Sequence, residues 1–332
     1  MKPFQYVRPA KLSEAIAAFH SDPEARYIAG GTNLTELMKR GVVSVGKLID
    51  INHLPLRKIE QKSGFTRIGA LALNSDVAAH KLIIAKHPLL AQALNAGASG
   101  QLRNMATVGG NILQQTRCTY YYDAAFPCNR RQPESGCSAV GGINRMHAIF
   151  GNPEGAMEKS CIAVHPGDMG VALAALDARV IVLGQDGERS IPFHEFYKNP
   201  DANPAVNTTL NNGELVVAVE IPDQGFAQNI HYLKVRDRAS YAFALVSVAA
   251  ALDMEQGTIK VARLAMGGVA YKPWRLPEAE KLLTGRKASE AIFAEAAAIS
   301  LHGARPLAHN AYKLKLASNI IVEALKTAAR LT

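Results

Sequence analysis

The sequence contains few cysteines, few aromatic residues and no long apolar run. Its four cysteines all lie between positions 118 and 161, and none occurs elsewhere in the 332 residues. No uninterrupted apolar window reaches the length of about eighteen residues that a membrane span needs, so we expect no membrane-spanning helix. The N-terminus lacks the apolar run and cleavage site of a secretory signal. We therefore expect a protein that stays in the cytoplasm or is exported on a signal-bearing partner.

The basic charge of the chain does not indicate nucleic acid. The formal net charge is +9, but the basic residues are scattered and only 6% of residues are aromatic. Few rings are therefore available to stack on bases. We expect no nucleic-acid partner and interpret the basic surface as solvated or as facing an acidic protein subunit. No nucleophile elbow accompanies the Ser, His and Asp residues, so we predict no catalytic side chain.

Two glycine loops each follow an apolar stretch. Residues 26–29 predict a strand that runs into Gly-Gly-Thr-Asn at 30–33, and residues 34–40 predict the helix that follows. The second loop is Thr-Val-Gly-Gly-Asn at 107–111. Bare backbone N–H groups beside short polar side chains suit a diphosphate. One such loop could simply be a tight turn, but two of them favour a nucleotide cofactor.

Later segments predict more sheet and a helical C-terminus. A broken helical stretch is expected from Ser75 towards Leu94, with an interruption at Pro88. Apolar runs at 178–183 and 215–222 predict strands. The last domain is expected to hold three strands and two long helices, at 231–236, 244–252, 260–266, 291–301 and 311–331.

These features, in this order, resemble the FAD-binding subunits of molybdenum hydroxylases, the xanthine dehydrogenase and carbon monoxide dehydrogenase family. The residues that carry the resemblance are 29–34, 106–111, Asp168, 215–222 and Lys234. The resemblance covers nearly the whole chain. It implies an α+β fold, in which a two-part FAD-binding domain of the PCMH type precedes a smaller C-terminal domain with a three-stranded antiparallel sheet and helices.

The resemblance also implies domain boundaries and cofactor contacts. The expected FAD-binding subdomains are 1–55 and 56–225, the second with an iron–sulfur insertion at 113–166, and the C-terminal domain is 226–332. FAD would be held noncovalently, with Tyr241 or Phe243 near the isoalloxazine. The implied cofactor-binding residues are Arg26, Tyr27, Ile28, Ala29, Gly30, Gly31, Thr32, Asn33, Leu34, Thr107, Val108, Gly109, Gly110, Asn111, Asp168, Val216 and Lys234.

The cysteine spacing, C-x9-C-x8-C-x23-C, does not identify a metal. It matches neither bacterial ferredoxins nor zinc ribbons, and two disulfides, zinc or inert buried thiols remain alternatives. The segment is too polar for a simple core of its own, so we expect something to anchor it. His147 and His165 flank the last cysteine and could be ligands, but polar loop histidines are more often solvated, and we interpret them as solvated loop residues.

The inserted segment itself resembles those of 4-hydroxybenzoyl-CoA reductase and bacterial periplasmic aldehyde oxidase flavoproteins, which carry a [4Fe–4S] cluster near the flavin. This resemblance implies that Cys118, Cys128, Cys137 and Cys161 ligate such a cluster. It also favours the periplasm over the cytoplasm.

The implied function is electron transfer within a molybdenum-dependent aldehyde oxidoreductase. Electrons would pass from a large molybdenum-cofactor subunit through a small [2Fe–2S] subunit to this FAD and then to an external acceptor. The alternative is a stand-alone FAD-dependent reductase of the PCMH fold. That enzyme would need its own substrate pocket and a proton donor at the flavin, for which the sequence offers no clear candidate.

Overall fold

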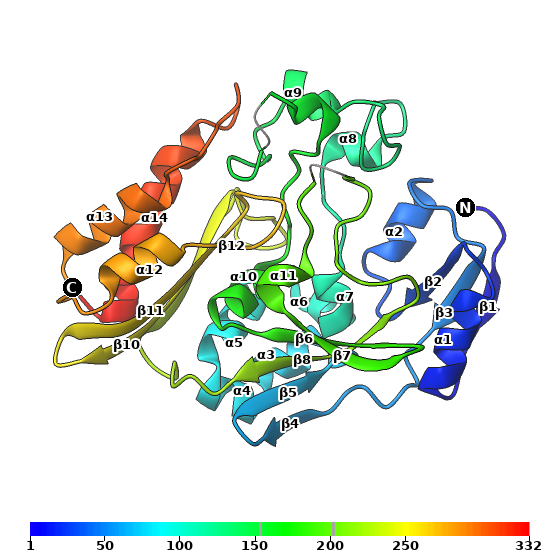
Figure 1. Ribbon diagram of the computed structural model, residues 1–332, viewed down its shortest axis with the longest axis horizontal. Coiled ribbons are helices and arrows are strands. Elements are labelled where there is room, and N and C mark those ends of the chain that lie inside the picture. Colours follow the sequence, from blue (N-terminus) through cyan, green and yellow to red (C-terminus); the bar gives the residue numbers. More distant parts are fainter. Residues whose placement is uncertain (153–154, 201–202, 332) are drawn as a thin grey trace.

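The computed structural model describes residues 1–152, 155–200 and 203–331. Three sheets follow one another along the described chain, and each has helices packed on it (Figure 1). The α+β fold is confirmed. No helix in the described ranges combines the length and the apolar character that a membrane crossing requires.

The N-terminal sheet is parallel and has the strand order β1-β3-β2. Its central strand is buried throughout, because a parallel strand between helices has both faces covered. The predicted strand and helix around the first glycine loop are β2 and α2. The elements are β1 (Gln5–Val7), α1 (Leu12–His20), β2 (Ala25–Ile28), α2 (Leu34–Lys39) and β3 (Lys47–Asp50).

The second sheet is antiparallel, in the order β4-β5-β8-β6-β7. Its strands are β4 (Ile59–Lys62), β5 (Phe65–Gly69), β6 (Arg179–Gly184), β7 (Gly187–Pro192) and β8 (Leu215–Pro222). Its helices are α3 (Asn74–Ala79), α4 (Lys81–Lys86), α5 (Pro88–Ala96), α10 (Asp168–Ala175) and α11 (Phe193–Phe196). The expected break at Pro88 is the start of α5, because proline at the first helical position loses no hydrogen bond.

The C-terminal sheet has four strands where three were expected. The extra strand, β12, has two residues paired with β11, too few to leave a periodic pattern in the sequence. On β10, Val246 and Val248 face the terminal helices, whereas Ser247 and Ala249 face α10. The elements are β9 (Ile230–Val235), β10 (Val246–Glu255), β11 (Thr258–Gly267), β12 (Trp274–Arg275), α12 (Pro277–Leu283), α13 (Glu290–Ser300) and α14 (Tyr312–Ala329).

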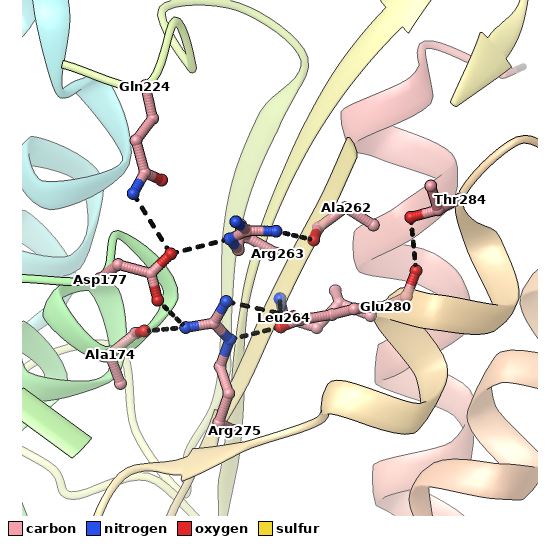
Figure 2. Close-up of polar contacts among 9 residues, drawn as sticks. All are labelled: Ala174, Asp177, Gln224, Ala262, Arg263, Leu264, Arg275, Glu280 and Thr284. Atoms are coloured by element: carbon pink, nitrogen blue, oxygen red, sulfur yellow. Dashed lines mark hydrogen bonds and ion pairs between the residues drawn. The ribbon is translucent and has the colours of Figure 1, made fainter. Parts of the chain in front are cut away.

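A polar network fastens the end of α10 to the C-terminal sheet (Figure 2). Asp177, just after α10, accepts hydrogen bonds from Arg263 at 2.9 Å and from Arg275 at 2.6 Å. Arg275 also donates to the Ala174 carbonyl and to Glu280. Since all eight residues of α10 are buried, this helix lies rigidly between the second and third sheets.

The cysteine-bearing segment lies between α2 and the C-terminal helices, at the top of Figure 1. Its own elements are short, and those of the preceding connection are too: α6 (Gly100–Arg103), α7 (Val108–Ile112), α8 (Thr119–Tyr122), α9 (Ser138–Gly141) and η1 (Met157–Lys159).

The cysteine segment is anchored by its neighbours. Tyr121 packs on Leu37 of α2, and Ile149 and Phe150 belong to the C-terminal core, where they are 0% and 2% exposed. The sequence showed too few apolar residues for a core of the segment's own. Those residues bury themselves against two other parts of the chain instead.

Candidate cofactor sites

The two glycine loops meet at Gly30. A Cβ built on Gly30 would lie 1.8 Å from the Met105 carbonyl oxygen, so only glycine allows this approach. Gly31 has a φ of +69°, in the left-handed region. Asn33 then accepts a hydrogen bond from the backbone N–H of Gln115 at 2.8 Å. The structure therefore brings residues 30–33 beside the second loop, as two parts of one diphosphate cradle would require.

The glycines of the second loop have different surroundings. The Gly109 N–H donates to the Ala70 carbonyl at 2.8 Å, and a Cβ there would press on Ala70 at 3.1 Å. Gly109 is therefore needed for packing, and its N–H group is not free for a phosphate. Gly110 is exposed, and a Cβ there would approach only Thr107 Oγ1, at 3.1 Å. Of the two, Gly110 has the open side that a cofactor needs.

Three of the expected FAD-binding residues have side chains engaged within the protein. The Tyr27 hydroxyl donates to the Gly213 carbonyl at 2.9 Å, and Arg26 donates to the Ala25 carbonyl at 2.6 Å. Val216 is 2% exposed within the second sheet. The Tyr27 hydroxyl and the Val216 side chain are therefore engaged inside the protein, whereas Arg26 is exposed.

Asp168 lies in a buried polar cluster at the N-terminus of α10. Its Oδ2 accepts a hydrogen bond from Lys234 Nζ at 2.8 Å, and its Oδ1 accepts one from the Tyr232 hydroxyl at 2.8 Å. The Lys234 side chain is 3% exposed and that of Asp168 is 7% exposed. Lys234 Nζ also donates to the Ala96 carbonyl. The structure thus joins two of the expected flavin-side residues and adds Tyr232, which the sequence did not indicate.

A cavity of about 240 Å³, counted with the space at its mouth, opens beside this cluster. Phe243 lines it, whereas Tyr241 does not. The cavity is hereafter called the flavin-side cavity. Its lining consists of Val164, His165, Pro166, Gly167, Asp168, Phe243, Ala244, Ser247, Gly267 and Gly268.

All four cysteines line a second cavity of about 300 Å³, counted in the same way and hereafter called the cysteine cavity. Cys128 and Cys137 are paired across a short antiparallel bridge. Burial raises the pKa of Cys118 to about 12, and it also raises the pKa values of Cys137 and Cys161. The described structure contains the four as free thiols. The four cysteines are well separated in the sequence, so it is the fold, and not one short loop, that places them around this cavity.

Two basic side chains border the cysteine cavity. His147 Nε2 lies 3.2 Å from Cys118 Sγ. Arg130 donates a hydrogen bond to Gln115 Oε1 at 2.8 Å. Its positive charge lowers the pKa of Cys161, whereas burial raises it. His147 and His165 are only 5% and 8% exposed, and burial lowers both pKa values to about 4. The interpretation of these histidines as solvated loop residues was wrong. Their segments cross the protein interior, which local polarity does not reveal.

The two cavities are joined by one short stretch of chain. Cys161 and Ala163 line the cysteine cavity, and Val164 to Asp168 line the flavin-side cavity. Within the described ranges, no group of three or more His, Cys, Asp or Glu side chains is arranged to hold a single metal ion.

Two family models together match nearly the whole chain. Residues 2–224 match the FAD binding domain in molybdopterin dehydrogenase, and residues 231–328 match the CO dehydrogenase flavoprotein C-terminal domain. The chain belongs to the FAD-binding subunits of the molybdenum hydroxylases. FAD is therefore the cofactor of this flavoprotein, and its family consists of oxidoreductase subunits.

Individual relatives agree with the family assignment. The flavoprotein is 46% identical to the aldehyde oxidoreductase FAD-binding subunit PaoB of Escherichia coli (strain K12), over 99% of each chain. It is 29% identical to the glyceraldehyde dehydrogenase medium chain of Sulfolobus acidocaldarius, over 86% of this chain and 83% of that one. The structure of quinoline 2-oxidoreductase from Pseudomonas putida 86 superposes with a TM-score of 0.75 at 26% identity, over 99% of each chain.

Proposed function

We propose that the chain is the electron-transfer subunit of a molybdenum-dependent aldehyde oxidoreductase and carries FAD and one [4Fe–4S] cluster. The observation that carries the proposal is the convergence of Cys118, Cys128, Cys137 and Cys161 on one cavity next to the flavin-side cavity. The relative at 46% identity is named an aldehyde oxidoreductase subunit, which supports the substrate class.

A cluster fits the cysteine cavity better than a single ion does. In a four-iron cubane each thiolate binds a different iron, so the sulfurs surround the cluster and do not converge on one point. The placement of the four cysteines around one cavity supports this proposal. Bound iron would also lower the pKa values of these thiols, which burial raises, because metal ligation requires thiolates.

For FAD, we propose that residues 30–33 and 107–111 hold the diphosphate, with Gly110 as the closest approach. Residues 26–29 would contribute through their backbone. Asp168 and Lys234 would meet the flavin end, with Val216 in the sheet behind and Phe243 at the cavity. When bound, FAD supplies the two-electron chemistry, and these residues orient it and stabilise its charge.

The proposed partners are a large molybdenum-cofactor subunit, a small [2Fe–2S] subunit and an external electron acceptor. The proposed location is the periplasm, reached with a signal-bearing partner. We retain 1–55, 56–225 and 226–332 as the proposed domains, with the iron–sulfur insertion at 113–166. No observation on the described chain favours the stand-alone reductase.

The test is to purify the chain with and without co-expressed neighbouring subunits under anaerobic conditions. We expect flavin bands, a broad iron–sulfur shoulder, about four irons per chain and co-purifying subunits. Each cysteine-to-serine variant should lose most of this iron together. Ser138→Ala is the matched control, because Ser138 lines the same cavity and its hydroxyl bonds the Pro127 carbonyl.

Other results would contradict the proposal in distinct ways. Zinc in a colourless protein would mean that the cysteines hold a zinc site and not a cluster. Disulfides would instead make the serine variants lose function in pairs. Iron-free anaerobic protein with FAD fully bound would overturn the cluster alone. Aldehyde oxidation by the isolated, molybdenum-free chain would overturn the electron-transfer role.

A further inference from the structure

Reduction of the flavin by iron–sulfur clusters delivers electrons without protons. The balanced change is FAD + 2 e⁻ + H⁺ → FADH⁻, so one N–H bond must form at the flavin with a proton from elsewhere. The following inference rests on the proposed function, because it assumes that electrons arrive from metal clusters. Inside a buried cavity, a group of this chain must supply that proton.

The residues around Asp168 form one continuous hydrogen-bonded chain. Lys234 Nζ donates to Asp168 at 2.8 Å, and the Tyr232 hydroxyl lies 2.8 Å from Asp168 Oδ1 and 3.1 Å from Ser247 Oγ. The pairing of β9 with β10 places Ser247 opposite Lys234. Tyr232 lies two residues before Lys234 on β9, so its side chain points to the same face of the sheet. All four side chains are held by the rigid sheet and by α10.

Ser247 is the end of this chain that meets the flavin-side cavity. It is 0% exposed to solvent and lines the cavity together with Asp168 and Gly267. A Cβ at Gly267 would lie 2.5 Å from Ser247 Oγ and 2.6 Å from Val171 Cγ2, so only glycine at 267 leaves room for the hydroxyl. Tyr232 does not line the cavity and is linked to it through its hydrogen bonds with Ser247 and Asp168.

The single hydroxyl proton of Tyr232 gives the chain two arrangements. When Tyr232 donates to Asp168, the Ser247 hydroxyl donates to the Tyr232 oxygen. When Tyr232 donates to Ser247, the Ser247 proton is free to point into the cavity. Burial and the neighbouring Asp168 raise the pKa of Tyr232 well above its usual value, so this hydroxyl is protonated while the chain is at rest.

We propose that Ser247, Tyr232, Asp168 and Lys234 form a proton relay that serves the flavin. The Ser247 O–H bond breaks as the flavin N–H bond forms, and Ser247 takes the Tyr232 proton. As it gives up that proton, Tyr232 receives another from Asp168, whose carboxyl group has been protonated by the Lys234 ammonium group and has turned towards the tyrosine. The amine left at Lys234 takes up one H⁺ from the solvent, so the net change is one proton moved from solvent to the flavin. No electrons pass through these residues, so the relay supplies only the one proton that accompanies two electrons, and FADH⁻ keeps one negative charge.

The test uses the assembled, FAD-loaded complex and reduced methyl viologen as a one-electron donor. Flavin absorbance is followed after rapid mixing in H₂O and in D₂O. The wild type should show a solvent isotope effect. In Tyr232→Phe and in Ser247→Ala, flavin reduction should slow by about 10²-fold, the low end of what a positioned proton donor contributes, and its isotope effect should change.

The matched controls are Tyr312→Phe and Ser300→Ala, whose hydroxyls bond the Arg145 and Ala296 carbonyls. Both should react like the wild type. FAD content and the equilibrium midpoint potential of the flavin are measured for every variant, because a relay alters the rate of proton delivery and leaves both nearly unchanged. Ser247→Ala keeps the inference testable if Tyr232→Phe fails to fold.

Each outcome bears on a distinct claim. Unchanged rates and isotope effects in both FAD-loaded variants would overturn the relay and leave the proposed function intact. A shifted midpoint potential at an unchanged rate would mean that these residues only bond the flavin, which also overturns the relay. A wild-type complex whose flavin takes no electrons from its iron–sulfur clusters would overturn the proposed function itself.

Discussion

Replacing Gly30 and replacing Gly110 should weaken FAD binding for different reasons. A Cβ at Gly30 would stand 1.8 Å from the Met105 carbonyl oxygen, whereas real Cβ contacts essentially never fall below 3.0 Å. Gly30→Ala must therefore push the two loops apart by about 1.2 Å, the difference between those distances. Overpacking of this kind costs about 1–3 kcal/mol, and it separates the two halves of the cradle.

Gly110→Val should spare the fold. The residue is exposed, and its added Cβ would approach only Thr107 Oγ1. The valine side chain would occupy the proposed route of the diphosphate. We expect FAD affinity to fall at least about tenfold, which corresponds to about 1.4 kcal/mol, while the unfolding midpoint stays near that of the wild type.

Gly100→Ala is the matched control, because a Cβ there would meet nothing within 4 Å. The assay is FAD content per chain by absorbance, together with denaturant unfolding of each variant. Full FAD content in Gly110→Val would refute the placement of the diphosphate at the second loop. A Gly30→Ala variant as stable as the wild type would refute the contact between the loops.

Other parts of the molecule give three further expectations. Arg275→Met should reduce the free energy of unfolding by about 2–4 kcal/mol, measured with denaturant, because it leaves Asp177 partly unpaired in the network of Figure 2. Burial lowers the pKa of His87 from 6.5 to about 4, so the unfolded chain takes up a proton first and stability falls as pH drops from 6.5 towards 4. The loss should reach about 2 kcal/mol at pH 5, and unfolding curves of His87→Gln should lack it. Lys313→Met leaves the buried Gly268 carbonyl without the Lys313 donor and the His147 carbonyl with Asn310 alone. It should lower the unfolding midpoint and the iron content of the proposed cluster together, whereas exposed Lys315→Met should change neither.

Local signals in the sequence were enough for much of the fold. The strand and helix around Gly30–Gly31, the strand at 215–222 and the long C-terminal helices were confirmed, because each has its own apolar period and its own turn residues. The two-residue strand β12 was missed, since it has no period of its own.

The site was predictable only where family resemblance or a turn motif identified it. Tyr232 and Ser247 are fifteen positions apart and become neighbours of Asp168 only through the register of β9 with β10. His147 looked like a polar loop residue, because the helix that buries it lies far along the chain. Long-range packing of this kind leaves no mark on the neighbouring sequence.

That packing also has a consequence for how the protein is made. The carbonyl of His147, whose ring borders the cysteine cavity, is held by Asn310 and Lys313, and Asn310 lies 163 residues further along the chain. Since chains emerge from the ribosome N-terminal end first, all four cysteines are synthesised before the residues that hold this wall of the cavity. The cysteine cavity is therefore complete only when translation is nearly over, and the proposed cluster would be held securely only from then on.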